Sequence, residues 1–251
     1  MTDLSLATGP AELASLLPPA ISAKYPYARG YLLLRAPENA EVVACRALLE
    51  PERLAALLDR FALKFPGSDR RATASLWTMH YFGVLTIGAA IAVLEAGQAL
   101  PLKLDDVSLC LEQGSAQPRA FVLPAPAGES VPAEAALGDL LRSHAEPLIE
   151  ALAIAGRISR RLLWSNVLSY LGWIVDEIAG SGVKGEASNW ANLIRAAAWP
   201  DGWANPMHGL IQAEVDGAGV PCARRRVCCL RYALPSIGGC GTVCPLPAGR
   251  H

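Results

Sequence analysis

The chain has 251 residues, enough for one large domain or two small ones with a substantial core. Apolar residues make up 52% and charged residues 18% of the chain, which excludes an intrinsically disordered protein. The 22 basic and 23 acidic residues nearly cancel, so we expect no nucleic-acid partner.

Helices and short extended runs alternate in the first 125 residues. Apolar spacing predicts an amphipathic helix over 10–23 and a second helix over 51–64, ended by Pro66-Gly67. Extended runs at 31–35 and 41–47 flank a turn and predict a β-hairpin. The runs 107–112 and 119–123 flank a Gly/Pro turn and predict another.

A long uncharged run lies between these hairpins. Residues 72–94 contain no Lys, Arg, Asp or Glu, and a helix of that length could span a bilayer. Its first half, however, contains Thr73, Ser75, Thr78 and His80, and its densely apolar part is only 14 residues long. We therefore predict a buried core helix over about 71–96 rather than a membrane span.

The second half of the chain is expected to be helical. The Pro- and Ala-rich stretch 124–132 predicts a loop and a boundary. Ser143 to Glu146 form a capping-box pattern that predicts the start of a helix running to Gly156 and resuming through Ala179. A further helix is predicted over 189–199, followed mainly by loop.

Five of the seven cysteines fall within the last 30 residues. Cys228, Cys229, Cys240 and Cys244 give the pattern C-C-x10-C-x3-C. Four thiolates are the ligand set of a [2Fe–2S] cluster or of structural zinc. Adjacent cysteines fit one small tetrahedral ion poorly, which favours the cluster, while redox dithiols or unrelated buried thiols are the third alternative.

The cysteine segment also resembles a known family. Cys-Cys-Leu-Arg-Tyr-x-Leu-Pro followed by Cys-Gly-x-x-Cys-Pro resembles the C-terminus of the ferric-siderophore reductases, the FhuF-like iron–sulfur proteins. The segments 74–77, 81–83 and 105–109 resemble the middle region of that family. The resemblance implies that Cys228, Cys229, Cys240 and Cys244 bind a [2Fe–2S] cluster. Three residues rather than the family's two separate the last two cysteines, so Cys222 is held as an alternative ligand.

The resemblance further implies a function. The protein would be an oxidoreductase that reduces a cytosolic ferric siderophore by one electron and so releases Fe²⁺, with no catalytic residue beyond the cluster. Electrons would come from a ferredoxin or a flavoprotein reductase, because no flavin or nicotinamide site is visible in the sequence. Two alternatives remain: a helical interaction module with a structural zinc tail, and a [2Fe–2S] sensor or electron carrier without a siderophore site.

The tail is strongly basic. Residues 217–251 contain five arginines and no acid. Positive charge near a cluster favours its reduced state. Arg224, Arg225, Arg226 and Arg231 are candidates for docking an anionic siderophore or an acidic electron donor, and a solvated basic loop is the alternative.

These observations predict a predominantly α-helical α+β fold with a small antiparallel β element and an irregular C-terminal iron–sulfur segment. We divide the chain into an N-terminal α/β portion on the substrate side (1–125), a helical portion (126–216) and a [2Fe–2S]-binding segment (217–251). The N-terminus lacks the basic and apolar regions of a signal peptide. We therefore expect a cytoplasmic protein, with peripheral association with the inner face of the membrane as the alternative.

Overall fold

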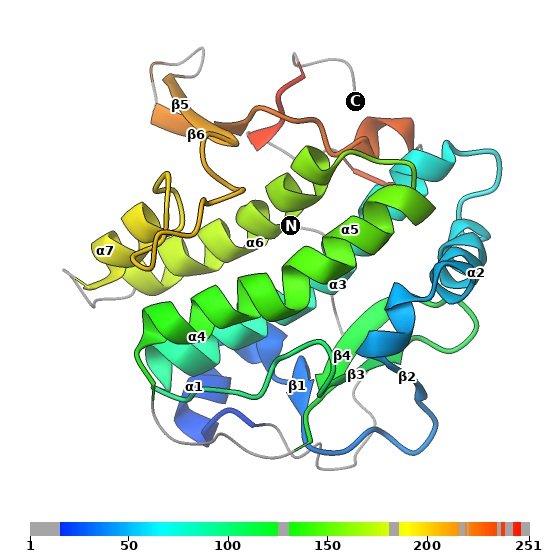
Figure 1. The fold of residues 1–251 in the computed structure, drawn as a ribbon, viewed down its shortest axis with the longest axis horizontal. Helices are drawn as coiled ribbons and strands as arrows, with labels where there is room; N and C mark the ends of the chain where they lie inside the picture. Colours follow the sequence, from blue (N-terminus) through cyan, green and yellow to red (C-terminus); the bar gives the residue numbers. More distant parts are fainter. Residues whose placement is uncertain are drawn as a thin grey trace.

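The computed structural model describes residues 16–124, 131–180, 186–215, 219, 221–234, 237–238 and 243–246. Helices gather around one long helix, α3, with a small sheet on one side of them and the C-terminal part of the chain on the other (Figure 1). The predominantly helical α+β fold is thus confirmed. The division into three portions stays a prediction.

Helix α3 (Arg70–Ala90) is the centre of the fold. The Asp69 carboxylate accepts a hydrogen bond from the backbone N–H of Arg71 at 2.8 Å and caps its first turn. Nearly every side chain of the helix is buried, as expected for a helix that is apolar on all sides. Of its most apolar 18-residue window, 94% is buried inside the fold, which confirms the prediction of a core helix. The helix ends in a π-helical turn, Ile91–Glu95.

Two glycines of α3 allow its neighbours to approach closely. A Cβ at Gly83 would lie 3.3 Å from the Tyr170 ring of helix α6 (Arg160–Gly180). A Cβ at Gly88 would lie 2.8 Å from Leu32 in strand β1 (Leu32–Leu33), closer than packed atoms tolerate. Helix α2 (Pro51–Ala62), close to its predicted bounds, packs on a third side of α3.

The main sheet has the strand order β1-β4-β3-β2. Strands β3 (Ser108–Leu111) and β4 (Pro118–Val122) pair antiparallel, which confirms the second predicted hairpin. The first predicted hairpin is wrong. Strand β1 pairs in parallel with β4, while β2 (Glu41–Ala44) pairs antiparallel with β3, so the two runs lie on opposite edges. The backbone carbonyls of Tyr31 and Leu33 accept hydrogen bonds from the N–H groups of Phe121 in β4 and of Leu123 just after it, so this segment and not the run 41–47 is the partner of β1.

The turn between β3 and β4 is held by Glu112. Its carboxylate accepts hydrogen bonds from Ser115, Arg119 and, at 3.0 Å, from Lys64 Nζ. Burial acts to raise the pKa of Glu112, but these hydrogen bonds outweigh it and lower the pKa to about 2. The carboxylate is therefore ionised in the folded protein at neutral pH.

The predicted helix start at Ser143 is wrong. Helix α4 (Ala133–Leu140) runs through a π-helical turn (Leu141–Ala145) directly into α5 (Glu146–Ala155). Pro147 has no backbone N–H, so it cannot donate the helical hydrogen bond to the Ser143 carbonyl. The π-helical turn lies directly before the helical turn that contains Pro147. The Ser143 carbonyl instead accepts the Leu104 N–H at 3.3 Å, so a contact from a distant loop supplies the missing partner.

The remaining helices follow the prediction in part. Helix α5 ends before Gly156, Arg157 takes a positive φ of 51°, and α6 resumes at Arg160, as expected. Helix α7 spans Glu186–Leu193 rather than 189–199. Of the first predicted helix, the described part contains α1 at Pro19–Lys24, followed by a 3₁₀ turn at Pro26–Ala28, and residues 1–15 lie outside the described residues.

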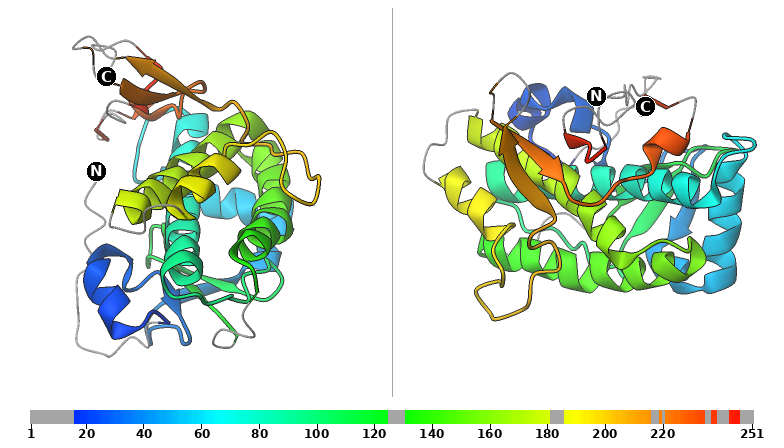
Figure 2. Two further views of the ribbon diagram at one scale, coloured as in Figure 1. Left: turned by 90° about the vertical axis from the view of Figure 1, so that its left-hand side faces the viewer. Right: turned by 90° about the horizontal axis from the view of Figure 1, so that it is seen from above.

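The C-terminal part is more regular than expected. Strands β5 (Ile211–Val215) and β6 (Pro221–Arg225) form an antiparallel hairpin where loop was predicted. A 3₁₀ turn, Arg231–Ala233, follows and packs on α3. Seen from above, this part of the chain lies across the helical layer (Figure 2).

Candidate metal centre

The adjacent cysteines lie just after β6. Cys228 is half-buried and Cys229 is buried, with 1% of its surface exposed. Leu230 follows with a left-handed φ of 64°, which reverses the chain immediately after the two cysteines. Cys244 is also buried. Cys240 lies outside the described residues, and Cys222 is described in its backbone only.

Two of the sulfur atoms accept hydrogen bonds from the backbone. The Leu230 N–H donates to Cys228 Sγ at 3.3 Å, and the Leu246 N–H donates to Cys244 Sγ at 3.4 Å. In both cases the donor lies two residues after the cysteine. Such N–H···S bonds stabilise the thiolate form and tune iron–sulfur centres.

The three described thiols of the tail are close enough to influence one another. Burial raises the pKa of Cys228, the Leu230 N–H lowers it, and the thiols of Cys229 and Cys244 raise it further. The charge of Arg225 acts in the lowering direction. The net result is that the pKa of the Cys228 thiol is raised above its ordinary value.

Within the described ranges, no group of three or more His, Cys, Asp or Glu side chains is placed to hold a metal ion. Cys240, the third cysteine of the predicted ligand set, lies outside those ranges. The donors that are described are all sulfur, and two already have backbone N–H groups pointing at them. This donor set fits a centre that takes thiolate ligands.

The four candidate arginines do not point in one direction. Arg224 forms an ion pair with Glu214 at 2.8 Å, and Arg226 is exposed. Arg225 is 1% exposed and points into the helical layer. Arg231 is 9% exposed, and its Nε has no hydrogen-bond partner in the described part of the chain.

A second group of residues holds the cysteine segment and was not identified from the sequence. Ser75 Oγ in α3 donates to the Cys229 carbonyl at 2.8 Å, and Asn166 in α6 binds Ser75 from the other side. All three residues are buried. The signal in the sequence is the presence of polar residues in otherwise apolar helices, which in α3 indicated only that the helix does not span a membrane.

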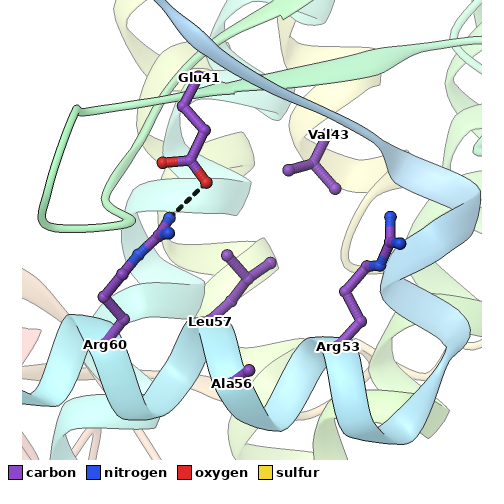
Figure 3. Close-up of a pocket in the computed structure, with 6 residues that line it drawn as sticks. All are labelled: Glu41, Val43, Arg53, Ala56, Leu57 and Arg60. Atoms are coloured by element: carbon purple, nitrogen blue, oxygen red, sulfur yellow. Dashed lines mark hydrogen bonds and ion pairs between the residues drawn. The ribbon is translucent and has the colours of Figure 1, made fainter.

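A cavity of about 360 Å³ opens between β2 and α2 (Figure 3). Arg60 and Glu41 form an ion pair at 2.6 Å at one side of it, and Arg53 lies at the other. Its six lining residues include neither a cysteine nor a residue of the tail. It is therefore separate from the candidate metal centre.

His80 and His144 lie in the core around α3. His80 is half-buried beside Phe61, with 6.0 Å between ring centroids, and burial together with nearby cations lowers its pKa to about 4. His144 is fully buried and lies 2.6 Å from Tyr81 Oη. Both histidines fit a role in packing.

The chain is similar in sequence to a protein family and to a named relative. Residues 75–216, more than half of the chain, match the family described as "Ferric iron reductase FhuF-like transporter". The chain is 24% identical over 180 residues to a protein of Escherichia coli (strain K12) named "Ferric siderophore reductase". That alignment covers 69% of this chain and 65% of the relative, just under two thirds of the relative's length. The family match ends before β6 and the cysteine segment.

Proposed function

The chain belongs to the FhuF-like family, and from this premise we propose that it is an oxidoreductase that reduces the iron of a ferric siderophore. We further propose that Cys228, Cys229, Cys240 and Cys244 hold a [2Fe–2S] cluster. The observation that carries this assignment is the pair of backbone N–H groups that already donate to Cys228 Sγ and Cys244 Sγ. Family membership supports the activity, and the tail's sulfur donors support the cofactor.

The substrate chemistry explains why a one-electron donor suffices. A siderophore holds the hard ion Fe³⁺ through oxygen donors, and those donors bind Fe²⁺ much less tightly. When bound, a [2Fe–2S] cluster supplies electrons one at a time. The reaction therefore balances as Fe³⁺ plus one electron giving Fe²⁺, with the electron taken from an external ferredoxin or flavoprotein reductase.

The chain's own residues hold and tune the centre. The cysteine thiolates bind, the Leu230 and Leu246 N–H groups stabilise negative charge on sulfur, and burial of Cys229 and Cys244 restricts water. Arg226 is exposed and can meet an anionic siderophore or an acidic electron donor. Arg231, two residues after Cys229, is 9% exposed and is the second candidate.

We propose a cytoplasmic location, with peripheral association with the inner face of the membrane as the alternative. The apolar helix α3 is mostly buried in the fold, which supports a role in the core rather than in a bilayer. The siderophore and its reductant would then meet the protein in the cytoplasm.

The decisive experiment is anaerobic purification followed by visible and EPR spectroscopy with iron and sulfide analysis. We expect about two iron and two sulfide per chain and an EPR signal on reduction. Excess dithionite and a ferric hydroxamate should then give Fe²⁺, trapped by a ferrous chelator. A colourless protein with one zinc would identify the interaction module, and a pigmented protein inert toward every ferric chelate would identify a sensor or carrier.

The ligand assignment is tested by single substitutions. Cys244→Ser should bleach or strongly alter the spectrum. Cys110→Ser, at a buried thiol in β3, is the matched control and should leave the spectrum unchanged. An unchanged spectrum in Cys244→Ser with a bleached Cys222→Ser would transfer the ligand role to Cys222.

A further inference from the structure

Two polar side chains close to helix α3 are buried with an atom that lacks a hydrogen-bond partner. Tyr31, just before β1, is 2% exposed, and Arg231, in the 3₁₀ turn of the tail, is 9% exposed. Neither Tyr31 Oη nor Arg231 Nε is hydrogen-bonded within the part of the chain that the structure describes. Buried polar atoms of a folded protein nearly always have a partner, so each exception calls for one, such as a ligand.

Three other parts of the fold meet α3 near these two side chains. The Tyr31 carbonyl accepts the Phe121 N–H at 2.8 Å, which fixes Tyr31 beside β4. The Tyr170 ring of α6 lies against Gly83 of α3, where a Cβ would come within 3.3 Å of it. His80, three residues before Gly83, lies on the same face of the helix. Strand β4, helix α6 and the 3₁₀ turn of the tail all pack on α3.

Electrostatic effects indicate that the side chains lie close together. Burial raises the pKa of Tyr31 to about 12, Tyr170 adds to the increase, and Arg119 of β4 opposes it. Burial also raises the pKa of Tyr170, whereas Arg231 lowers it. Burial and nearby cations, Arg119 and Arg231 among them, lower the pKa of His80 to about 4. Charges act on one another appreciably only over short distances, so these residues form a tyrosine–arginine cluster around His80.

The tyrosine–arginine cluster is positively charged and partly open to solvent. Lys64 and Arg119 share one carboxylate, because both form ion pairs with Glu112, Lys64 at 3.0 Å. Arg231 adds a third cation, which acts on His80 together with the other two. The side chains of Lys64 and Arg119 are 36% and 28% exposed, so the cluster has a side that faces solvent. Its charge and its exposed side suit a small anionic ligand.

The cysteine segment borders the tyrosine–arginine cluster. The Cys229 carbonyl is bound to α3 by Ser75 Oγ at 2.8 Å, and Arg231 follows two residues later. Cys229 also acts on Tyr170, whose pKa it raises. A ligand held by the cluster would therefore lie beside the segment proposed to hold the electron-transferring centre.

We propose that the tyrosine–arginine cluster binds the ferric siderophore and selects ferric complexes with a net negative charge. Such a complex presents the oxygen atoms that coordinate Fe³⁺, and phenol and guanidinium groups donate hydrogen bonds to oxygen. The inference rests on the proposed reductase function and deepens it by naming the binding groups and the charge of the substrate. It places the substrate at Tyr31, Arg119, Tyr170 and Arg231 rather than at the exposed arginines of β6.

Charge selection is tested with gallium(III) complexes, because Ga³⁺ resembles Fe³⁺ in charge and size but is not reduced. One probe is gallium(III)–desferrioxamine B, whose free ammonium makes the complex cationic. The other is the same complex with that amine succinylated, which makes it anionic. In calorimetric titration of the anaerobically purified protein, the anionic complex should bind at least about tenfold more tightly, as one charge-assisted hydrogen bond would give. Equal affinities, tighter binding of the cationic complex, or no binding of either would overturn the proposal.

The role of Arg231 is tested with Arg231→Gln. The loss of its charge should weaken binding of the anionic complex about tenfold without weakening that of the cationic complex. Arg46→Gln is the matched control, since it removes an arginine from another 3₁₀ turn, Cys45–Leu49, where the side chain is 75% exposed and screened by solvent. It should change either affinity by less than about twofold. Equal losses in the two variants would show a general effect of charge and overturn the site.

Tyr31→Phe carries the test even if Arg231→Gln does not fold. It removes only Oη, so no hydrogen bond of the described chain is lost and the protein should be as stable as wild type. Affinity for the anionic complex should nevertheless weaken by about threefold to tenfold. Tyr81→Phe is the control: its buried hydroxyl lies 2.6 Å from His144 Nε2, so stability should fall while affinity is unchanged. Wild-type affinity in Tyr31→Phe would contradict the assignment of Tyr31.

The arrangement of the cluster is tested without any ligand. Because the charge of Arg231 acts to lower the pKa of His80, Arg231→Gln should raise the pKa of the His80 imidazole in an NMR titration. Arg46→Gln should leave it unchanged. A wild-type pKa of His80 in Arg231→Gln would place Arg231 away from the cluster and overturn the proposal.

The outcomes separate this inference from the proposed function. A protein that binds the anionic gallium complex through Tyr31 and Arg231, but reduces no ferric complex, keeps the binding site and loses the proposed function. A protein that reduces ferric siderophores, but binds both gallium complexes equally, keeps the function and loses the charge selection.

Discussion

The buried histidine His144 should make the protein sensitive to mild acid. Its Nδ1 lies 2.7 Å from the Leu102 carbonyl and its Nε2 lies 2.6 Å from Tyr81 Oη. A carbonyl only accepts, so Nδ1 carries the proton and Nε2 accepts from the tyrosine. Burial lowers the pKa of His144 to about 4, while the Leu102 carbonyl acts in the opposite direction. The folded protein therefore holds the ring neutral where the unfolded chain protonates it.

The size of the effect follows from proton linkage. The unfolded chain takes up the proton near pH 6.5 and the folded protein only near pH 4. The contribution of His144 to the free energy of unfolding is therefore most favourable above pH 6.5, and it decreases as the pH falls toward 4. Between pH 7 and pH 5 the free energy of unfolding should decrease by about 1.8 kcal/mol through His144 alone. His80, with a pKa of about 4, should add a similar loss.

The assay is urea unfolding of wild type and His144→Gln at pH 7, 6 and 5. The amide of glutamine does not titrate, so the variant should lose about 1.8 kcal/mol less than wild type between pH 7 and pH 5. Ser22→Ala, which removes a buried serine–carbonyl bond but no titratable group, is the control and should keep the wild-type pH dependence. NMR titration of the His144 ring in the wild-type protein measures the same pKa without any substitution.

Two results would refute this reasoning. One is a pH dependence in His144→Gln that equals that of wild type. The other is an imidazole titration of His144 near pH 6.5 in the folded protein, since burial would then not suppress protonation.

Four further substitutions test other parts of the fold. Gly88→Ala should destabilise the protein by about 1–3 kcal/mol in thermal unfolding, because its Cβ would overlap a leucine of β1. Gly180→Ala, with open space around it, should change stability by less than about 0.5 kcal/mol. Trp77→Phe should cost about 2 kcal/mol in urea unfolding, because it leaves the Ala116 carbonyl without its indole donor at 2.8 Å. Glu112→Gln should remove part of the stability loss that wild type shows as the pH falls from 4.5 toward 2, and an unchanged acid-unfolding curve would contradict its low pKa.

Elements with strong local signals were predicted well. Helix α2 has a proline at its first position and a regular apolar face, and α3 has a long uncharged run behind the Asp69 cap. The β3–β4 hairpin has a Gly/Pro turn between two extended runs. In each case the residues that specify the element are neighbours in the chain, so the pattern is visible without the fold.

Elements that depend on distant partners were missed. The pairing of β1 with β4 and of β2 with β3 is decided by strands about 65 to 90 residues away. The helix start at Ser143 failed because a carbonyl freed by Pro147 finds the Leu104 N–H in a distant loop. Local sequence patterns do not identify which remote segment supplies such a partner.

In the candidate site, too, some features are visible in the local sequence and others depend on distant partners. Cysteine spacing in the sequence, together with the family resemblance, is what singles out Cys228, Cys229, Cys240 and Cys244 as candidate ligands, and their ligand role stays a prediction. The direction of each arginine was decided only by the tertiary structure, which buries Arg225 and exposes Arg226 one residue later. A side chain's electrostatic role depends on burial and on partners from other elements, and these exist only once the helices and the tail have packed together.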